Sequence, residues 1–254
     1  MRASLLILAL FAPAPTLLAA DYPATIDWAD VARLGTPLSG RVASVSVEVG
    51  ARVKQGAVLA TLDRRGYEAE LKRAEAELKR LQATFAETER EYNRARELFE
   101  RTVLSTTELQ QAETAFNAGQ ASLHAADANV TLARLNLEYS QVRAPFDGVV
   151  IERNVHPGET VANQLQVSPL LRVASVTRWV ARAWVDPATG AGLRPGTEVA
   201  VTVLGQRLTG TLRGIGLASR TDASGATGIA LDITFRAGDA LTLAPGLPAM
   251  VTLP

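Results

Sequence analysis

The middle of the sequence carries two consecutive apolar heptad patterns, and these constrain the fold more than any other feature. The first alternates steps of three and four through Leu71, Ala74, Leu78, Leu81, Phe85, Thr88, Tyr92, Ala95 and Phe99. The second repeats that alternation through Leu109, Ala112, Phe116, Gly119, Leu123, Ala126, Val130, Ala133 and Leu137. This spacing is typical of coiled-coil helices. Because few residues separate the patterns, they predict an antiparallel helical hairpin whose helices are each ~50 Å long.

Short β-rich segments flank the hairpin and share one spacing. Each has a glycine, a second glycine ten residues later and a valine three residues after that: Gly40, Gly50 and Val53 before the hairpin, and Gly148, Gly158 and Val161 after it. Glycine-bounded alternation predicts short strands joined by tight turns. Each half is too small to fold alone, so we expect the two halves to form one β domain that holds the base of the hairpin.

The C-terminal segment contains several strand candidates separated by turn signals. They are Trp179 to Val185, Glu198 to Val203, Arg207 to Arg213, Ile229 to Phe235 and Ala249 to Leu253. Their spacing predicts a small antiparallel β-barrel over residues 176–254. The segment 21–38 has no period of its own, and we expect it to add an edge strand to that barrel.

The N-terminus reads as a signal peptide over residues 1–20. A short apolar run from Leu5 to Phe11 is followed by two prolines and ends in the small residues Ala19 and Ala20. The alternative, a buried N-terminal helix, would place both prolines inside its own pattern. No later segment approaches membrane-spanning length, so we expect an exported protein without a direct membrane span.

Composition excludes several functions. The 26 basic residues balance the 26 acidic ones, so no net positive field favours nucleic acid. The chain has no cysteine and two histidines, which excludes thiol nucleophiles and Cys/His zinc sites. We find no catalytic constellation, and predict no cofactor, no metal site and no enzymatic activity.

With these motifs in order, the chain resembles the periplasmic adaptor subunits, or membrane fusion proteins, of tripartite efflux pumps, most closely those of the resistance-nodulation-division type. The motifs are Ser39-Gly40-Arg41-Val42 before the hairpin and Ala144-Pro145-Phe146-Asp147-Gly148 after it. The resemblance implies a mixed α and β, elongated multi-domain fold. A split lipoyl-like β domain has halves at 39–65 and 141–175, an antiparallel coiled-coil hairpin at 66–140 is inserted between them, and a small antiparallel β-barrel follows.

The resemblance also implies function and partners. A protein of this family links an inner-membrane efflux transporter to a TolC-type outer-membrane channel, without catalysis, and self-assembles into a ring, hexameric by the same analogy. It lies in the periplasm and is associated with the inner membrane through its partners. Because the chain stops at Pro254, we expect the membrane-proximal domain of many such adaptors to be absent or minimal.

The family carries an Arg, Leu, Ser signature at the hairpin tip, where the adaptor meets the channel. Arg94, Leu98 and Ser105 stand at its spacing. Each also has a simpler interpretation: Arg94 as a solvated charge, and Ser105 with Glu108 as a capping box that starts the second helix. We expect Leu98 to lie beside the heptad seam, exposed, one turn from Arg94.

Two other function classes remain open. A lipoyl- or biotinyl-type carrier would need a modified lysine, and Lys54 is the candidate, although it lacks the acidic or methionine neighbours of such lysines. A structural coiled-coil envelope protein would explain the hairpin but not the two half-motifs. Ion-binding adaptors use methionine clusters, whereas only Met1 and Met250 occur here.

Overall fold

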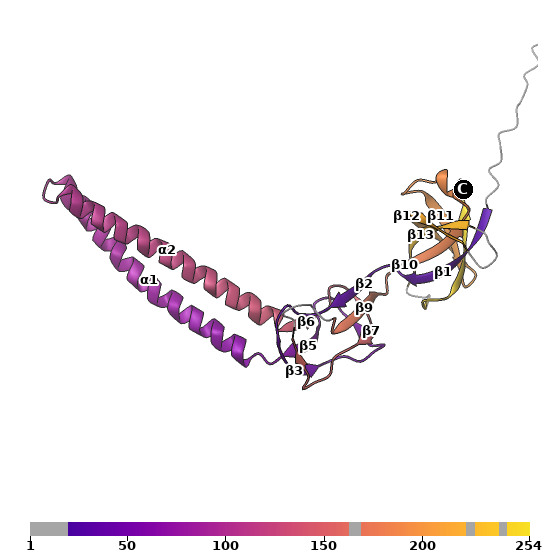
Figure 1. Cartoon of the computed structure of the whole chain (residues 1–254), viewed down its shortest axis with the longest axis horizontal. Helices are drawn as coiled ribbons and strands as arrows, with labels where there is room; N and C mark the ends of the chain where they lie inside the picture. The colour runs from indigo at the N-terminus through magenta and orange to yellow at the C-terminus, as the bar shows by residue number, and fades with distance from the viewer. Residues whose placement is uncertain (1–19, 163–168, 222–226, 239–242) are drawn as a thin grey trace, which may run out of the picture. The chain divides into compact units, whose positions relative to one another are not determined.

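The computed structural model describes residues 20–162, 169–221, 227–238 and 243–254 (Figure 1). The chain divides into two compact units. The barrel unit combines the N-terminal stretch ending at Asp30 with Ser175–Pro254, and the sandwich unit is Val31–Ala174. The expected signal peptide lies outside the described residues except for Ala20, the first residue of a strand.

The barrel unit is a closed six-stranded antiparallel barrel, as the sequence predicted. Around the barrel the order is β1 (Ala20–Trp28), β10 (Arg178–Val185), β13 (Thr227–Arg236), β12 (Gln206–Thr221), β11 (Glu198–Val203) and β14 (Pro248–Leu253). A short helix, α3 (Pro187–Ala191), follows β10. Alternate residues point inward, so that Ile26, Val201, Ile233 and Val251 are fully buried.

The prediction that residues 21–38 add a strand to the barrel is confirmed for β1, but β1 is not an edge strand. β1 pairs with β10 on one side and β14 on the other, so it closes the barrel and has no free edge. Its inward residues Ala24 and Ile26 are buried, and Trp28 stacks on Trp179 at a centroid distance of 4.3 Å. The rest of the segment belongs to the sandwich unit, where β2 (Val31–Leu34) pairs with β9. Both assignments depend on partners far along the chain, which local pattern cannot reveal.

The sandwich unit contains two four-stranded sheets, ordered β2-β9-β7-β4 and β6-β5-β3-β8. The remaining bounds are β3 (Gly40–Val45), β4 (Arg52–Val53), β5 (Val58–Leu62), β6 (Gln141–Arg143), β7 (Gly148–Arg153), β8 (Thr160–Val161) and β9 (Leu171–Ser175). Leu59, Leu171, Val42 and Val150 fill the core between them.

The repeated glycines and valines pair crosswise in this sandwich. Gly40 pairs with Val161, and Gly148 pairs with Val53, so each half supplies the partner of the other. Gly50 adopts φ +89°, in the left-handed region where glycine avoids steric cost. The two sequence halves therefore interlock into one hydrophobic core.

Two long helices, α1 (Arg65–Glu100) and α2 (Thr106–Tyr139), lie side by side and run in opposite directions (Figure 1). The Phe116 ring lies 5.3 Å from that of Phe85 and 5.2 Å from that of Tyr92. At the base, Leu62 donates its backbone N–H to the Ser140 carbonyl at 2.8 Å. The chain therefore leaves β5 and returns to β6 at adjacent points.

Candidate partner-docking site

The tip of the helical pair is closed by a two-hydrogen-bond turn at the end of α1. The Thr102 amide donates to the Phe99 carbonyl at 2.8 Å, and the Val103 amide donates to the Leu98 carbonyl at 2.9 Å. These bonds form a Schellman motif, which needs a left-handed residue after the cap. Thr102 supplies it with φ +62°, a strained conformation for a β-branched residue. The turn is thus well defined although it contains no glycine.

The start of α2 is fixed by the capping box that the sequence predicted. The Glu108 amide donates to Ser105 Oγ at 3.3 Å, and the Ser105 amide donates to Glu108 Oε2 at 3.0 Å. The Ser105 hydroxyl also donates to Glu108 Oε2 at 2.7 Å. This hydroxyl and then this amide lower the pKa of Glu108 below its ordinary value. The Schellman motif at the end of α1 and the capping box at the start of α2 therefore hold the tip in place.

The expected exposure of Leu98 is wrong. Leu98 is partly buried and continues the covered side of α1 from Ala95, whereas Phe99, assigned to the seam, is 36% exposed. Arg94 is exposed on α1 one turn earlier and makes no ion pair with any residue that the structure describes.

Sequence reasoning missed Val103. Its side chain is 70% exposed, more than any other large apolar side chain in the described ranges. The available signal was an apolar residue in the short loop between two heptad patterns, where polar residues are usual. Leu98, Val103 and Ser105 all lie at the tip, where Val103 presents an exposed apolar side chain just before the capped start of α2.

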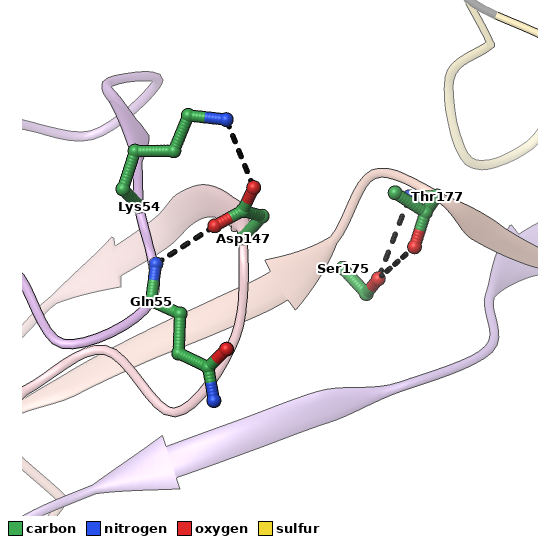
Figure 2. A network of polar contacts seen from close by, with 5 residues as sticks. All are labelled: Lys54, Gln55, Asp147, Ser175 and Thr177. Atoms are coloured by element: carbon green, nitrogen blue, oxygen red, sulfur yellow. Dashed lines mark hydrogen bonds and ion pairs between the residues drawn. The ribbon is translucent and has the colours of Figure 1, made fainter.

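Lys54, which directly follows β4, forms an ion pair with Asp147 (Figure 2). Lys54 Nζ lies 2.9 Å from Asp147 Oδ2, and the Gln55 amide donates to Asp147 Oδ1 at 2.8 Å. These donors, the amide first, lower the pKa of the Asp147 carboxyl. Asp147 belongs to the second half-motif and Lys54 to the first, so this contact joins the two halves. The Lys54 side chain is nevertheless 86% exposed, so this is a surface ion pair.

Within the described residues, no group of three or more histidine, cysteine or acidic side chains is placed to hold a metal ion. No helix in the described part of the chain is both long and apolar enough to cross a membrane.

Two interlocked half-motifs, a pair of long helices between them and a six-stranded barrel define a protein built on a barrel-sandwich hybrid domain. Residues 30–171 match the family described as "CzcB-like, barrel-sandwich hybrid domain". The chain therefore belongs to this family and is a membrane fusion protein, as the resemblance in its sequence implied.

Curated relatives agree with this assignment. The macrolide export protein MacA of Yersinia pestis is 30% identical over 199 residues, covering 72% of this chain and 54% of that protein. MacA of Escherichia coli O157:H7 is 30% identical over 190 residues, covering 69% and 51%. The chain thus spans about half the length of the curated relatives it matches.

Solved structures share the fold. A MacA-MexA chimeric protein containing the Pseudomonas aeruginosa MexA α-hairpin domain matches with a TM-score of 0.61 at 22% identity, covering 92% of this chain and 80% of that one. The membrane fusion protein Spr0693 of Streptococcus pneumoniae R6 matches with a TM-score of 0.66 at 17% identity, covering 91% and 97%. At these identities the likeness concerns architecture alone.

Proposed function

We propose that this chain is a non-enzymatic periplasmic adaptor that links an inner-membrane efflux transporter to a TolC-type outer-membrane channel. The observation that carries the proposal is the insertion of two long helices between halves of one sandwich, Gly40 pairing with Val161 and Gly148 with Val53. At 1.5 Å per residue, α1 spans ~54 Å. Such a length serves to reach across a space, which a carrier domain does not require.

In this proposal the parts of the chain have separate tasks. The lipoyl-like domain, with halves at 39–65 and 141–175, supports the coiled-coil hairpin at 66–140, and the barrel, in which residues 176–254 are joined by β1, holds the transporter. The signal peptide 1–20 would direct export and then be removed. Copies of the chain would assemble into a hexameric ring, so that their hairpins together meet the channel.

The hairpin tip is the proposed docking surface for the channel. Arg94, Leu98 and Ser105 are its sequence-derived members, and the exposure of Val103 adds a fourth. Burial of an apolar side chain in a well-packed pocket is the usual source of interface energy. Val103 offers such a side chain on a rigid turn, while Ser105 is already engaged with Glu108 and serves the shape of the tip.

Co-purification from cross-linked membranes tests the function. The full chain should recover both a transporter and an outer-membrane channel, and the transporter's identity would decide whether the pump is of the resistance-nodulation-division type. In a matched variant, residues 67–139 are replaced by a short Gly/Ser linker. Because β5 and β6 already lie side by side, this variant should keep a β structure that unfolds cooperatively. It should lose only the recovery of the channel. Recovery of neither partner by the folded full chain would contradict the proposal.

A further inference from the structure

A buried threonine from outside the hairpin holds the C-terminal end of α2. Thr36 lies in residues 35–39, here called the connector, which joins β2 to β3. Thr36 is 1% exposed, and its hydroxyl donates a 2.7 Å hydrogen bond to the carbonyl of Tyr139, the last residue of α2. Burial of a hydroxyl is unfavourable unless it is hydrogen-bonded, so an apolar side chain is the more usual occupant of such a position. The hydroxyl therefore points to a task at the end of the helix.

α2 has no terminator of its own at this end. No glycine follows the helix in the sequence, and its last turn contains no basic residue. The last carbonyls of a helix lack intrahelical donors and need other partners. The Leu137 carbonyl accepts from the Ser140 hydroxyl at 2.6 Å. The next carbonyls depend on other segments: that of Tyr139 accepts from Thr36, and that of Ser140 accepts from the Leu62 amide at 2.8 Å. The end of α2 is thus tied at two successive residues to chain outside the hairpin.

The connector also holds the start of α1. The hydroxyl of Tyr67, in the first turn of α1, donates to the Ser39 carbonyl at 3.0 Å. Ser39 stands three residues after Thr36 in the same connector. One short segment therefore contacts the last residue of α2 and the first turn of α1.

The connector is itself restrained by the sandwich. Leu34 and Leu38, two residues to either side of Thr36, pack against the hydrophobic core of the sandwich. The Leu38 amide donates to Thr36 Oγ1 at 3.2 Å, which orients the hydroxyl toward the helix end. Pro37 follows Thr36, and a proline restricts the residue before it to extended conformations. A segment anchored in this way can fix the direction of the helices that it contacts.

We infer that Thr36 is a positioning residue which, together with Tyr67, sets the direction in which the hairpin leaves the sandwich. The hairpin acts as a lever: over the ~54 Å of α1, a tilt of about 10° at the base moves the tip by about 9 Å. A docking tip on such a lever needs a stiff base. The inference rests on the proposed function insofar as it gives this stiffness a purpose, which is to present the tip to the channel.

Distances between two spin labels on the full chain test the inference, because the sequence has no cysteine and labels can be placed at will. Ala43→Cys, exposed on β3, reports on the sandwich, and Gln110→Cys, exposed on α2, reports on the hairpin near its tip. Electron–electron double resonance should give one narrow distribution for the otherwise unchanged chain. Thr36→Val, which keeps the side-chain shape and removes the donor, should broaden it by about 4–8 Å, the displacement from tilts of about 5–10° at about 45 Å from the base.

Two matched variants separate positioning from general stability. Thr36→Ser keeps the hydroxyl and should restore the narrow distribution. Thr160→Val makes the same chemical change at an exposed position on β8 and should leave the distribution unchanged. Helical circular dichroism should be the same in all of them, because the hydrogen bonds along α1 and α2 are intact.

Tyr67→Phe is a second route to the same result. Its hydroxyl bond is exposed, so the variant folds even if Thr36→Val does not, and it should also broaden the distribution. A narrow distribution in Tyr67→Phe and in folded Thr36→Val overturns the inference. So does equal broadening in Thr160→Val, or failure of Thr36→Ser to restore the narrow distribution. Broadening as expected in a chain that recovers no channel even without substitution would refute the proposed function and leave the positioning role standing.

Discussion

The backbone N–H of Val103 donates a 2.9 Å hydrogen bond to the carbonyl of Leu98, yet the two side chains differ in exposure. Leu98 is partly buried against the end of the hairpin, and Val103 is 70% exposed. The turn therefore holds the exposed side chain of Val103 in place through a hydrogen bond to Leu98, a residue that contributes to packing. Substitutions at these two positions should separate the stability of the hairpin from its docking.

Leu98→Asp should lower the free energy of unfolding by about 1–3 kcal/mol, because it places a carboxylate in a partly apolar contact. Val103→Asp should change that free energy by less than about 0.5 kcal/mol and still abolish recovery of the channel. Thermal melts followed by circular dichroism, together with channel cross-linking, measure both properties. Wild-type channel recovery by Val103→Asp would remove this residue from the docking surface.

Ser105→Ala should destabilise the hairpin by about 1 kcal/mol at neutral pH, since it removes the N-cap of α2. The folded-state pKa of Glu108 is lowered by Ser105, so the contribution of this contact is present above pH 4.5 and is lost as the pH falls through the lower folded value. The difference between variant and wild type should therefore narrow in acid. Thr107→Ala, outside the capping box, is the control, and an equal loss there would show that the cap is not responsible.

Thr102→Gly should stabilise the hairpin by about 0.5–1 kcal/mol. Glycine adopts the observed φ of +62° without the steric cost that a β-branched residue bears, and this gain exceeds the added entropy of the unfolded chain. Denaturant unfolding measures the change. Thr107→Gly, inside α2, should have the opposite sign. Loss of stability in Thr102→Gly would argue that the tip does not hold the left-handed turn.

Gly148→Ala should destabilise the sandwich by about 1–3 kcal/mol through overpacking. A methyl group there would overlap the Ala174 carbonyl oxygen and stand 2.9 Å from Val173 Cγ1. Gly40, its counterpart in the first half, is the matched control, because its nearest neighbour would be Leu62 Cδ1 at 3.7 Å. Equal melting temperatures for the two alanine variants would contradict the close approach of Gly148 to Val173 and Ala174 of β9.

The sequence predicted the local elements well and the long-range partners poorly. Heptad spacing located both helices, and the Ser105–Glu108 capping box located the start of α2. Both patterns lie within the helices that they predict, so they can be read from the local sequence. The split of residues 21–38 between β1 and β2 escaped prediction, since β1 depends on partners such as Leu253 and Trp179.

At the candidate site, residue spacing placed Arg94, Leu98 and Ser105 near the hairpin tip, but the exposure that it predicted for Leu98 was wrong. Leu98 and Phe99 are adjacent, so a seam pattern alone could not decide which of them would be covered. Val103 belongs to neither helix and was invisible to periodicity. The exposure of Val103 depends on the turn at Thr102, which adopts a left-handed conformation. A threonine in the sequence gives no indication of that conformation.

Site-specific cross-linking from the tip tests the adaptor function most directly. In cells that contain the whole pump, Val103→Cys treated with a short bifunctional reagent should cross-link to the outer-membrane channel. Gln82→Cys, exposed midway along α1, should not. Equal cross-linking of both variants to the channel, or none from a folded Val103→Cys protein, would contradict the conclusion that this hairpin bridges to a channel through its tip.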